Sequence, residues 1–220
     1  MNVIAIDGSS SAGKGTLALR LAETLDYAYL DTGALYRGVG FELLEQGLNP
    51  EDENAALKVA KSLSIERMLS LQDDSRIRNE VCGKAASLVS RLPSVRKALF
   101  DFQRRFALNP IKKDKTPAKG AILDGRDIGT VICPEAPIKI FLTANSEIRA
   151  QRRYKELQLK GLCVIYKDVL EDIIARDKRD AERATAPLKA ADDAFVIDTS
   201  SLTADDVYAQ VIRYINGRIN

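Results

Sequence analysis

One short segment near the start of the chain restricts the possible folds more than any other. Residues 8–16 read Gly-Ser-Ser-Ser-Ala-Gly-Lys-Gly-Thr and fit the pattern G-x-x-x-x-G-K. An apolar run over residues 3–6 precedes this segment, and leucines at i, i+4 and i+8 follow it over residues 16–25. The pattern is meaningful when a strand leads into the glycines and a helix leads out of them, and both are indicated here. The segment therefore predicts an α/β fold with a loop that holds phosphate groups.

The residue types of this loop suit a nucleoside triphosphate with Mg²⁺. Glycines let the backbone curl so that successive N–H groups point at phosphate oxygens, and the following helix adds its positive N-terminal end. Lys14 can reach the β- and γ-phosphates, and the Thr16 hydroxyl can ligate Mg²⁺. A glycine-rich turn without a ligand is the alternative, and the flanking strand and helix disfavour it. The residues expected to bind ATP are Gly8, Ser9, Ser10, Ser11, Ala12, Gly13, Lys14, Gly15 and Thr16.

The rest of the chain alternates between strands and helices, which favours a P-loop NTPase-type parallel sheet flanked by helices. Further strands are expected at residues 27–30, 121–123, 138–142 and 194–197, with a weak strand signal at 75–78. Helices are expected at residues 34–46, 52–63, 80–91, 95–106, 146–159, 167–183 and 204–215. We expect a core of residues 1–36 and 121–220, an inserted lobe of residues 37–107, and an exposed basic loop of residues 108–120.

Composition excludes several classes of function. The formal net charge is +2, from 33 basic and 31 acidic residues, which argues against nucleic acid as the main partner. There is no histidine, so histidine acid–base chemistry is excluded, and three scattered cysteines indicate reduced thiols rather than a disulfide or zinc framework. No run is long enough to span a bilayer and no signal peptide is apparent, so we expect a cytoplasmic protein.

Three more segments, together with the loop's G-K-G-T ending, resemble the bacterial cytidylate kinase family among the nucleoside monophosphate kinases. Residues 31–37 resemble its D-[ST]-G-A-x-Y-R segment, and residues 124–130 resemble its D-G-R-D-[IM]-G-T segment. Residues 176–188 resemble its R-D-x-R-D-x-x-R-x-x-x-P-L segment, and the matches run in order from residue 3 to about residue 215. Two places depart from the family: residues 64–79 look shorter, with a hairpin missing, and residues 109–120 look longer and more basic.

The resemblance implies transfer of the γ-phosphoryl group of ATP to CMP or dCMP, giving ADP and CDP or dCDP. It implies that the inserted lobe binds the monophosphate and that an arginine-rich helical lid covers about residues 149–187. The implied catalytic residues are Lys14, Arg126, Arg153 and Arg176, with Arg149 at ATP and Asp124 holding Mg²⁺ through water beside Thr16. The implied CMP-binding residues are Thr32, Tyr36, Arg37, Ser87, Arg96, Asp124, Arg126, Asp127, Asp180 and Arg183.

Spacing alone supports the lid less strongly than the resemblance does. Arg149 and Arg153 lie at i, i+4, and Arg176, Asp180 and Arg183 lie at i, i+4 and i+7, so each set shares one helix face. Such faces are equally typical of solvated charged helices. For Thr32, Tyr36 and Arg37, spacing alone favours a helix cap with a core tyrosine, and Ser87 and Arg96 alone read as ordinary surface residues.

Other functions remain open at this point. Another monophosphate kinase, acting on UMP or AMP, would show a different acceptor segment from residues 31–37. A nucleotide-dependent regulatory switch would need loops that sense the γ-phosphate, and no guanine-reading N-K-x-D segment is present. An RNA-binding role for residues 112–119 would need a longer basic run. We therefore expect a monomeric enzyme whose partners are small nucleotides, without nucleic acid or membrane.

Overall fold

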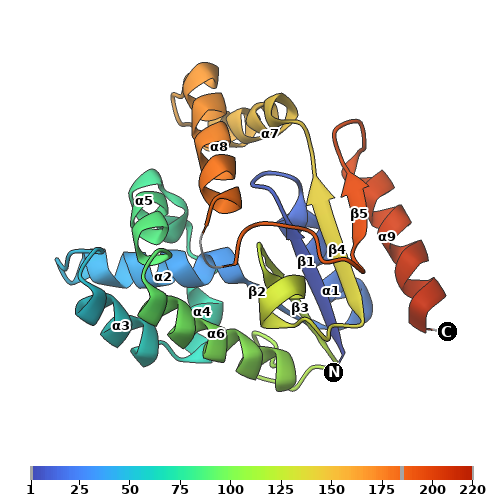
Figure 1. Ribbon diagram of the computed structural model, residues 1–220, viewed down its shortest axis with the longest axis horizontal. Helices are drawn as coiled ribbons and strands as arrows, with labels where there is room; N and C mark the ends of the chain where they lie inside the picture. The colour runs from blue at the N-terminus through green and yellow to red at the C-terminus, as the bar shows by residue number, and fades with distance from the viewer. Residues whose placement is uncertain (1, 184–185, 220) are drawn as a thin grey trace. The chain divides into compact units, whose positions relative to one another are not determined.

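The computed structural model describes residues 2–183 and 186–219 (Figure 1). Residues 1, 184, 185 and 220, which the expected core and lid include, lie outside the described residues. Five strands form one sheet in the order β2-β3-β1-β4-β5. The strands are β1 (Val3–Gly8), β2 (Ala28–Asp31), β3 (Ala121–Gly125), β4 (Ile138–Thr143) and β5 (Phe195–Asp198). Pairs β1–β4 and β4–β5 are parallel, with Ile6 opposite Ile140, which confirms the predicted α/β class with a parallel sheet flanked by helices.

The described chain divides into two compact units. The first covers residues 26–123 and holds α2 (Thr32–Glu45), α3 (Glu53–Ser62), α4 (Ile65–Leu71), α5 (Glu80–Val89) and α6 (Pro93–Leu108). The second covers residues 2–25 and 124–220 and holds α1 (Lys14–Leu25), α7 (Ser146–Leu159), α8 (Tyr166–Ala181) and α9 (Ala204–Ile219). Within the second unit α1 packs against β1 and α9, and α7 packs against α8. Among the described residues, no helix has the combination of length and apolarity that crossing a bilayer requires.

Short polar signals in the sequence set the helix boundaries. The Asp52 carboxylate accepts hydrogen bonds from the N–H groups of Asn54 and Ala55 and so begins α3. Asn79 begins α5 in the same way, and Pro93 occupies the first turn of α6, where its missing N–H costs nothing. Gly47, with φ of +65°, follows the end of α2.

The strand expected at residues 75–78 is wrong. Ser75–Arg78 forms a short 3₁₀ helix, η1, preceded by α4, which the sequence analysis did not predict. The Asp74 carboxylate accepts from the Arg76 N–H at 2.9 Å, and Ile77 is fully buried. The sequence Arg-Ile-Arg can bury its one apolar side chain either in a strand or in a single helical turn. The capping hydrogen bond to Asp74, which precedes it, favours the helical turn.

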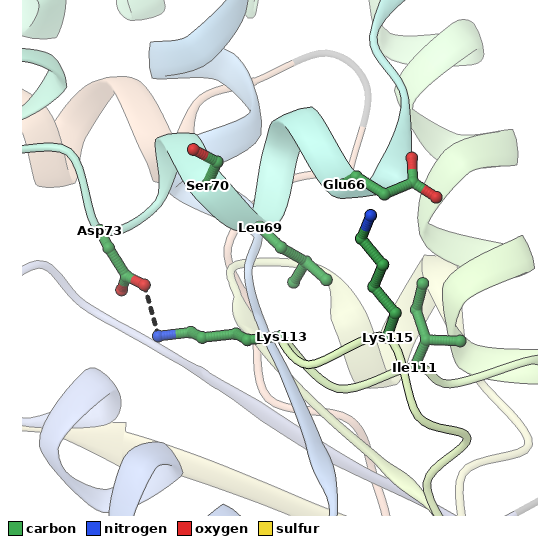
Figure 2. A pocket seen from close by; sticks show the side chains of 7 residues that line it. All are labelled: Glu66, Leu69, Ser70, Asp73, Ile111, Lys113 and Lys115. Atoms are coloured by element: carbon green, nitrogen blue, oxygen red, sulfur yellow. Dashed lines mark ion pairs between the residues drawn. The ribbon is translucent and has the colours of Figure 1, made fainter.

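Two of the four lysines in the basic loop before β3 pair with acids of its own unit. Lys112 pairs with Asp26, and Lys113 pairs with Asp73 at 2.5 Å. Ile111 and Pro117 form an isolated antiparallel bridge that closes the loop. Figure 2 shows the Lys113–Asp73 pair beside a cavity of about 190 Å³ under α4. The loop therefore presents less positive charge than its sequence suggests.

Candidate active site

The phosphate loop begins where β1 comes closest to β4. A Cβ atom at Gly8 would lie 1.9 Å from the Leu142 carbonyl oxygen, and the residue has φ of +142°. Only glycine fits there, because both the space and the backbone conformation exclude a side chain. Gly13, with φ of +98°, turns the chain into α1. These two positions explain why the pattern demands glycine where it does.

Two donors from outside the loop and one from within it hold the loop's carbonyl oxygens. An Arg149 guanidinium N–H donates to the Ser10 carbonyl at 3.3 Å, and the Thr199 hydroxyl donates to the Ala12 carbonyl at 3.2 Å. The Lys14 ammonium donates to the Ser9 carbonyl at 2.9 Å. Arg176 lies close by, with its guanidinium 3.4 Å from the Ser10 hydroxyl. Fixing the carbonyls in this way suits a loop whose N–H groups serve an anionic ligand.

Lys14 is a buried cation in positive surroundings. Its side chain lies at the start of α1, and burial lowers its pKa to about 7, assisted by the nearby guanidiniums of Arg126 and Arg176. Asp124 and Asp7 act in the opposite direction but do not outweigh these effects. A group of anionic oxygens bound at this loop would reverse the balance, because it would favour the charged ammonium.

We therefore expect ATP binding to take up a proton at mildly alkaline pH. Near pH 8, about one unit above the pKa of Lys14, most of this amine is neutral before binding and charged afterwards. Calorimetric titrations in two buffers with different ionisation enthalpies measure that uptake. Lys14→Arg is the control, since arginine stays charged and should remove the buffer dependence. A binding enthalpy that is the same in both buffers for the unaltered protein would contradict the expectation.

The site offers oxygen donors of the kind that Mg²⁺ prefers. The Thr16 hydroxyl lies exposed in the first turn of α1, and the Asp124 carboxylate is buried on β3. Asp124 also interacts electrostatically with Lys14, so the carboxylate lies near the phosphate loop. A hydroxyl and a carboxylate are hard donors, and this pair fits a magnesium ion bound partly through water.

A buried carboxylate joins two of the predicted substrate-binding arginines. Arg126 donates through Nε to Asp180 Oδ2 at 2.8 Å, and Arg183 pairs with Oδ1 of the same residue. Asp180 is 2% exposed. Burial alone would raise its pKa, but the two guanidiniums outweigh burial and hold the pKa below its ordinary value. The structure therefore brings Arg126, Asp180 and Arg183 together, with the carboxylate occupied by both arginines.

The arginines of α7 do not form one uniform face. Arg149 is buried and makes a two-bond ion pair with Asp177 of α8, while its Nε donates to the Ala144 carbonyl at 2.8 Å. Arg152 donates to the carbonyl and hydroxyl of Thr199 beyond β5, and Arg153 pairs with Glu156 at 2.8 Å. Helix spacing predicts that Arg149 and Arg153 share one face. Their side chains nevertheless point to different partners, because Asp177 lies on α8 and Glu156 lies on α7 itself.

Five of the ten predicted acceptor residues lie in the other unit, on α2 and α5 and at the start of α6. Thr32 is buried in the first turn of α2, where the Asp31 carboxylate accepts from the Ala34 N–H at 3.0 Å. Arg37 donates to the carbonyls of Ile77 and Asn79 at 3.1 and 3.4 Å. Helices α2 and α5 pack together, and α6 packs against α3. Partly buried side chains on these helices are Tyr36, Arg37, Ser87 and Arg96.

Two polar residues in these clusters escaped the sequence analysis. Arg78 pairs with Asp31 at 2.8 Å and so lies at the start of α2. Thr199 holds the phosphate loop and Arg152, as described above. The position of Thr199 directly after a parallel strand was a usable signal, since such strand ends face the ligand site. Arg78 was hidden by the mistaken strand at residues 75–78.

The family model and the relatives found by sequence agree on one family. The family model described as "Cytidylate kinase" matches residues 4–217. A protein of Paramagnetospirillum magneticum named "Cytidylate kinase" is 51% identical over 216 residues, 98% of each chain. One of Rhodospirillum rubrum with the same name is 51% identical over 203 residues, 92% of each. A solved structure of an uncharacterized protein from Eubacterium ventriosum has a TM-score of 0.55 at 15% identity, covering 99% of this chain and 100% of its own, which supports the fold alone. By sequence and by the segments that carry the site, this chain belongs to the cytidylate kinase family.

Proposed function

We propose that this chain transfers the γ-phosphoryl group of ATP, with Mg²⁺, to CMP or dCMP, giving ADP and the corresponding diphosphate. The observation that carries the proposal is the phosphate loop with its buried Lys14, which interacts electrostatically with Arg126 and Arg176 within one unit. The family and the relatives supply the choice of acceptor, since both are named cytidylate kinase.

The proposed roles follow from what phosphoryl transfer needs. The reaction requires positive charge around the transferring group and alignment of donor and acceptor, with little covalent help from the protein. Lys14, Arg126, Arg153 and Arg176 would supply that charge, and the loop with Arg149 would hold ATP. Thr16 and, through water, Asp124 would hold Mg²⁺, which when bound neutralises part of the phosphate charge. Asp180 would keep Arg126 and Arg183 oriented, because it already binds both.

Acceptor binding is assigned to the inserted lobe of residues 37–107 and to Thr32 and Tyr36 next to it. Arg37, Ser87 and Arg96 would contact the monophosphate from the lobe, while Asp124, Arg126, Asp127, Asp180 and Arg183 would contact it from the core of residues 1–36 and 121–220. The helices within about residues 149–187 would act as the lid that excludes water. We place the enzyme in the cytoplasm as a monomer acting on small nucleotides. We expect no nucleic acid among its partners, because the net charge is only +2 and the basic run in residues 108–120 is short.

A coupled assay of ADP release, with CMP, dCMP, UMP and AMP compared as acceptors, tests this function. We expect CMP and dCMP to give the highest kcat/KM. A preference for AMP or UMP would replace the proposal with another monophosphate kinase. Nucleotide hydrolysis that no acceptor accelerates would instead favour a regulatory switch.

Replacing Arg37 by alanine should weaken use of the acceptor far more than use of ATP. The guanidinium is a candidate donor to the acceptor phosphate, and losing a charged hydrogen bond of this kind costs about 1.5–3 kcal/mol, or roughly ten- to a hundredfold in kcat/KM for CMP. The KM for ATP should change by no more than about twofold. Arg67→Ala is a matched control in the same unit, because Arg67 pairs with Glu42 at 2.6 Å and has no assigned role. Equal losses toward both substrates would count against the assignment of Arg37.

A further inference from the structure

The carboxylate of Asp7 binds the backbone of the segment that carries Arg126. Asp7 is the residue before Gly8 at the end of β1 and is 5% exposed. Its Oδ1 accepts from the Ile128 N–H at 2.8 Å, and its Oδ2 accepts from the Gly129 N–H at 2.7 Å. Both bonds are buried and cross about 120 residues of sequence, so no local pattern announces them.

These two N–H groups lie at the start of a short π-helix, η2 (Ile128–Ile132). The first N–H groups of a helical turn have no partner within the turn and need one from elsewhere. Asp127 occupies the cap position, but its side chain makes no capping hydrogen bond. Asp7 therefore takes the place of a cap from a different strand. Single turns of π-helix are frequent at functional sites, where they re-aim the chain.

Gly129 lies close to both Asp7 and Lys139. A Cβ atom added at Gly129 would lie 3.2 Å from Lys139 Cδ and 3.4 Å from Asp7 Oδ2. The Lys139 ammonium is held in turn by both carboxylate oxygens of Asp193 at 2.9 Å. A side chain at residue 129 would therefore press on the Asp7 carboxylate and on the Lys139 stem, and glycine avoids both contacts.

Arg126 is consequently fixed at two points. Its side chain is held by Asp180, and its backbone lies two residues before the first N–H that Asp7 binds. Asp7 also directly precedes the phosphate loop, so one carboxylate ties the start of that loop to the Asp124–Asp127 segment. Burial raises the pKa of Asp7 to about 6, and the two N–H donors act against that rise. At neutral pH the group remains mostly ionised, as two N–H donors require.

We propose that Asp7 is a positioning residue for phosphoryl transfer, which sets the place of Arg126 relative to the phosphate loop through the backbone of Ile128 and Gly129. The inference rests on the proposed function. Asp7 itself has no assigned contact with either nucleotide. Its effect should fall on kcat rather than on the KM for ATP, because misplacing a charge that acts on the transferring group by about 1 Å can cost up to about a hundredfold.

A double-mutant cycle with Arg126 separates this role from a merely structural one. Asp7→Asn keeps the shape but presents an amide N–H to one backbone donor, so it should lower kcat by about ten- to a hundredfold with the KM for ATP within about threefold. In the Arg126→Ala background the same substitution should lower kcat by less than about twofold. Asp193→Asn is the control carboxylate, since Asp193 holds the Lys139 ammonium without touching the segment's N–H groups, and its kcat should stay within about twofold.

The proposal would be overturned if Asp7→Asn lowered kcat by the same factor in the unaltered protein and in Arg126→Ala. It would also be overturned if Asp7→Asn lowered the unfolding free energy but left kcat unchanged. Should Asp7→Asn not fold, Gly129→Ala disturbs the same contact by placing a Cβ atom 3.4 Å from Asp7 Oδ2, and it should show the same non-additivity with Arg126→Ala; an unchanged kcat for that variant would also overturn the proposal. Transfer to CMP by the unaltered protein is measured in the same assay. A failure of the proposed function would therefore show there first, separately from the comparison of variants.

Discussion

Replacing Lys14 by alanine is expected to reduce phosphoryl transfer to CMP by about 10²–10³-fold, the range found when one preorganised donor is removed from a developing negative charge. The Lys14 ammonium is buried beside the phosphate loop. A water molecule that filled its place in the alanine variant would not supply the positive charge. Steady-state kcat with saturating ATP and CMP measures the loss.

Two controls separate this loss from misfolding. Lys61→Ala removes an exposed lysine of α3 and should leave kcat within about twofold. Circular dichroism of Lys14→Ala should match that of the unaltered chain, because burial lowers the pKa of the Lys14 amine, and a lysine whose pKa is lowered by folding opposes folding at neutral pH. Turnover of Lys14→Ala close to normal would show that the γ-phosphate finds its positive partner elsewhere.

Replacing Asp180 by alanine should produce the largest loss of stability among the polar residues of the site. The substitution leaves Arg126 and Arg183 without the carboxylate that both bind. That carboxylate is buried, since Asp180 is 2% exposed. Removing one partner of a fully buried ion pair costs about 3–5 kcal/mol. Arg126 and Arg183 keep 15% and 27% of their side chains exposed, so water can solvate them in part and the loss should fall toward the lower end of that range. Urea unfolding at neutral pH gives the change in unfolding free energy.

Asp172→Ala is the matched control for this measurement. Asp172 lies exposed on the same helix, α8, and should change the unfolding free energy by less than about 0.5 kcal/mol. A loss below about 1 kcal/mol for Asp180→Ala would mean that water or another acid replaces the carboxylate, and the description of a buried three-residue cluster would then be wrong.

The parts of the fold that depend on local requirements could be predicted from the sequence. Gly8 and Gly13 are needed for backbone reasons that lie within the loop, so the pattern identified the loop, the strand before it and the helix after it. The boundary of α3 followed from Asp52 in the same way. Residues 75–78 failed because their short alternation fits a strand or a helical turn, and only the capping bond of Asp74 distinguishes the two.

The arrangement of the site depends on contacts between distant segments, which spacing cannot supply. Arg149 and Arg153 share a helix face in sequence terms, yet one is buried against Asp177 and the other pairs with Glu156 on its own helix. Spacing placed Asp180 and Arg183 on one helix face, but nothing in the sequence indicated that Asp180 would also bind Arg126. The role of Asp7 was equally hidden, because its partners are backbone groups of residues 128 and 129.

The most direct test of the central claim follows the phosphoryl group itself. ATP labelled with radioactive phosphorus in its γ position is incubated with the protein, Mg²⁺ and CMP, and the products are separated. We predict that the label appears in CDP, in step with ADP, and that Lys14→Ala lowers this transfer by about 10²–10³-fold. Label recovered as inorganic phosphate, with CMP unchanged, would contradict this prediction.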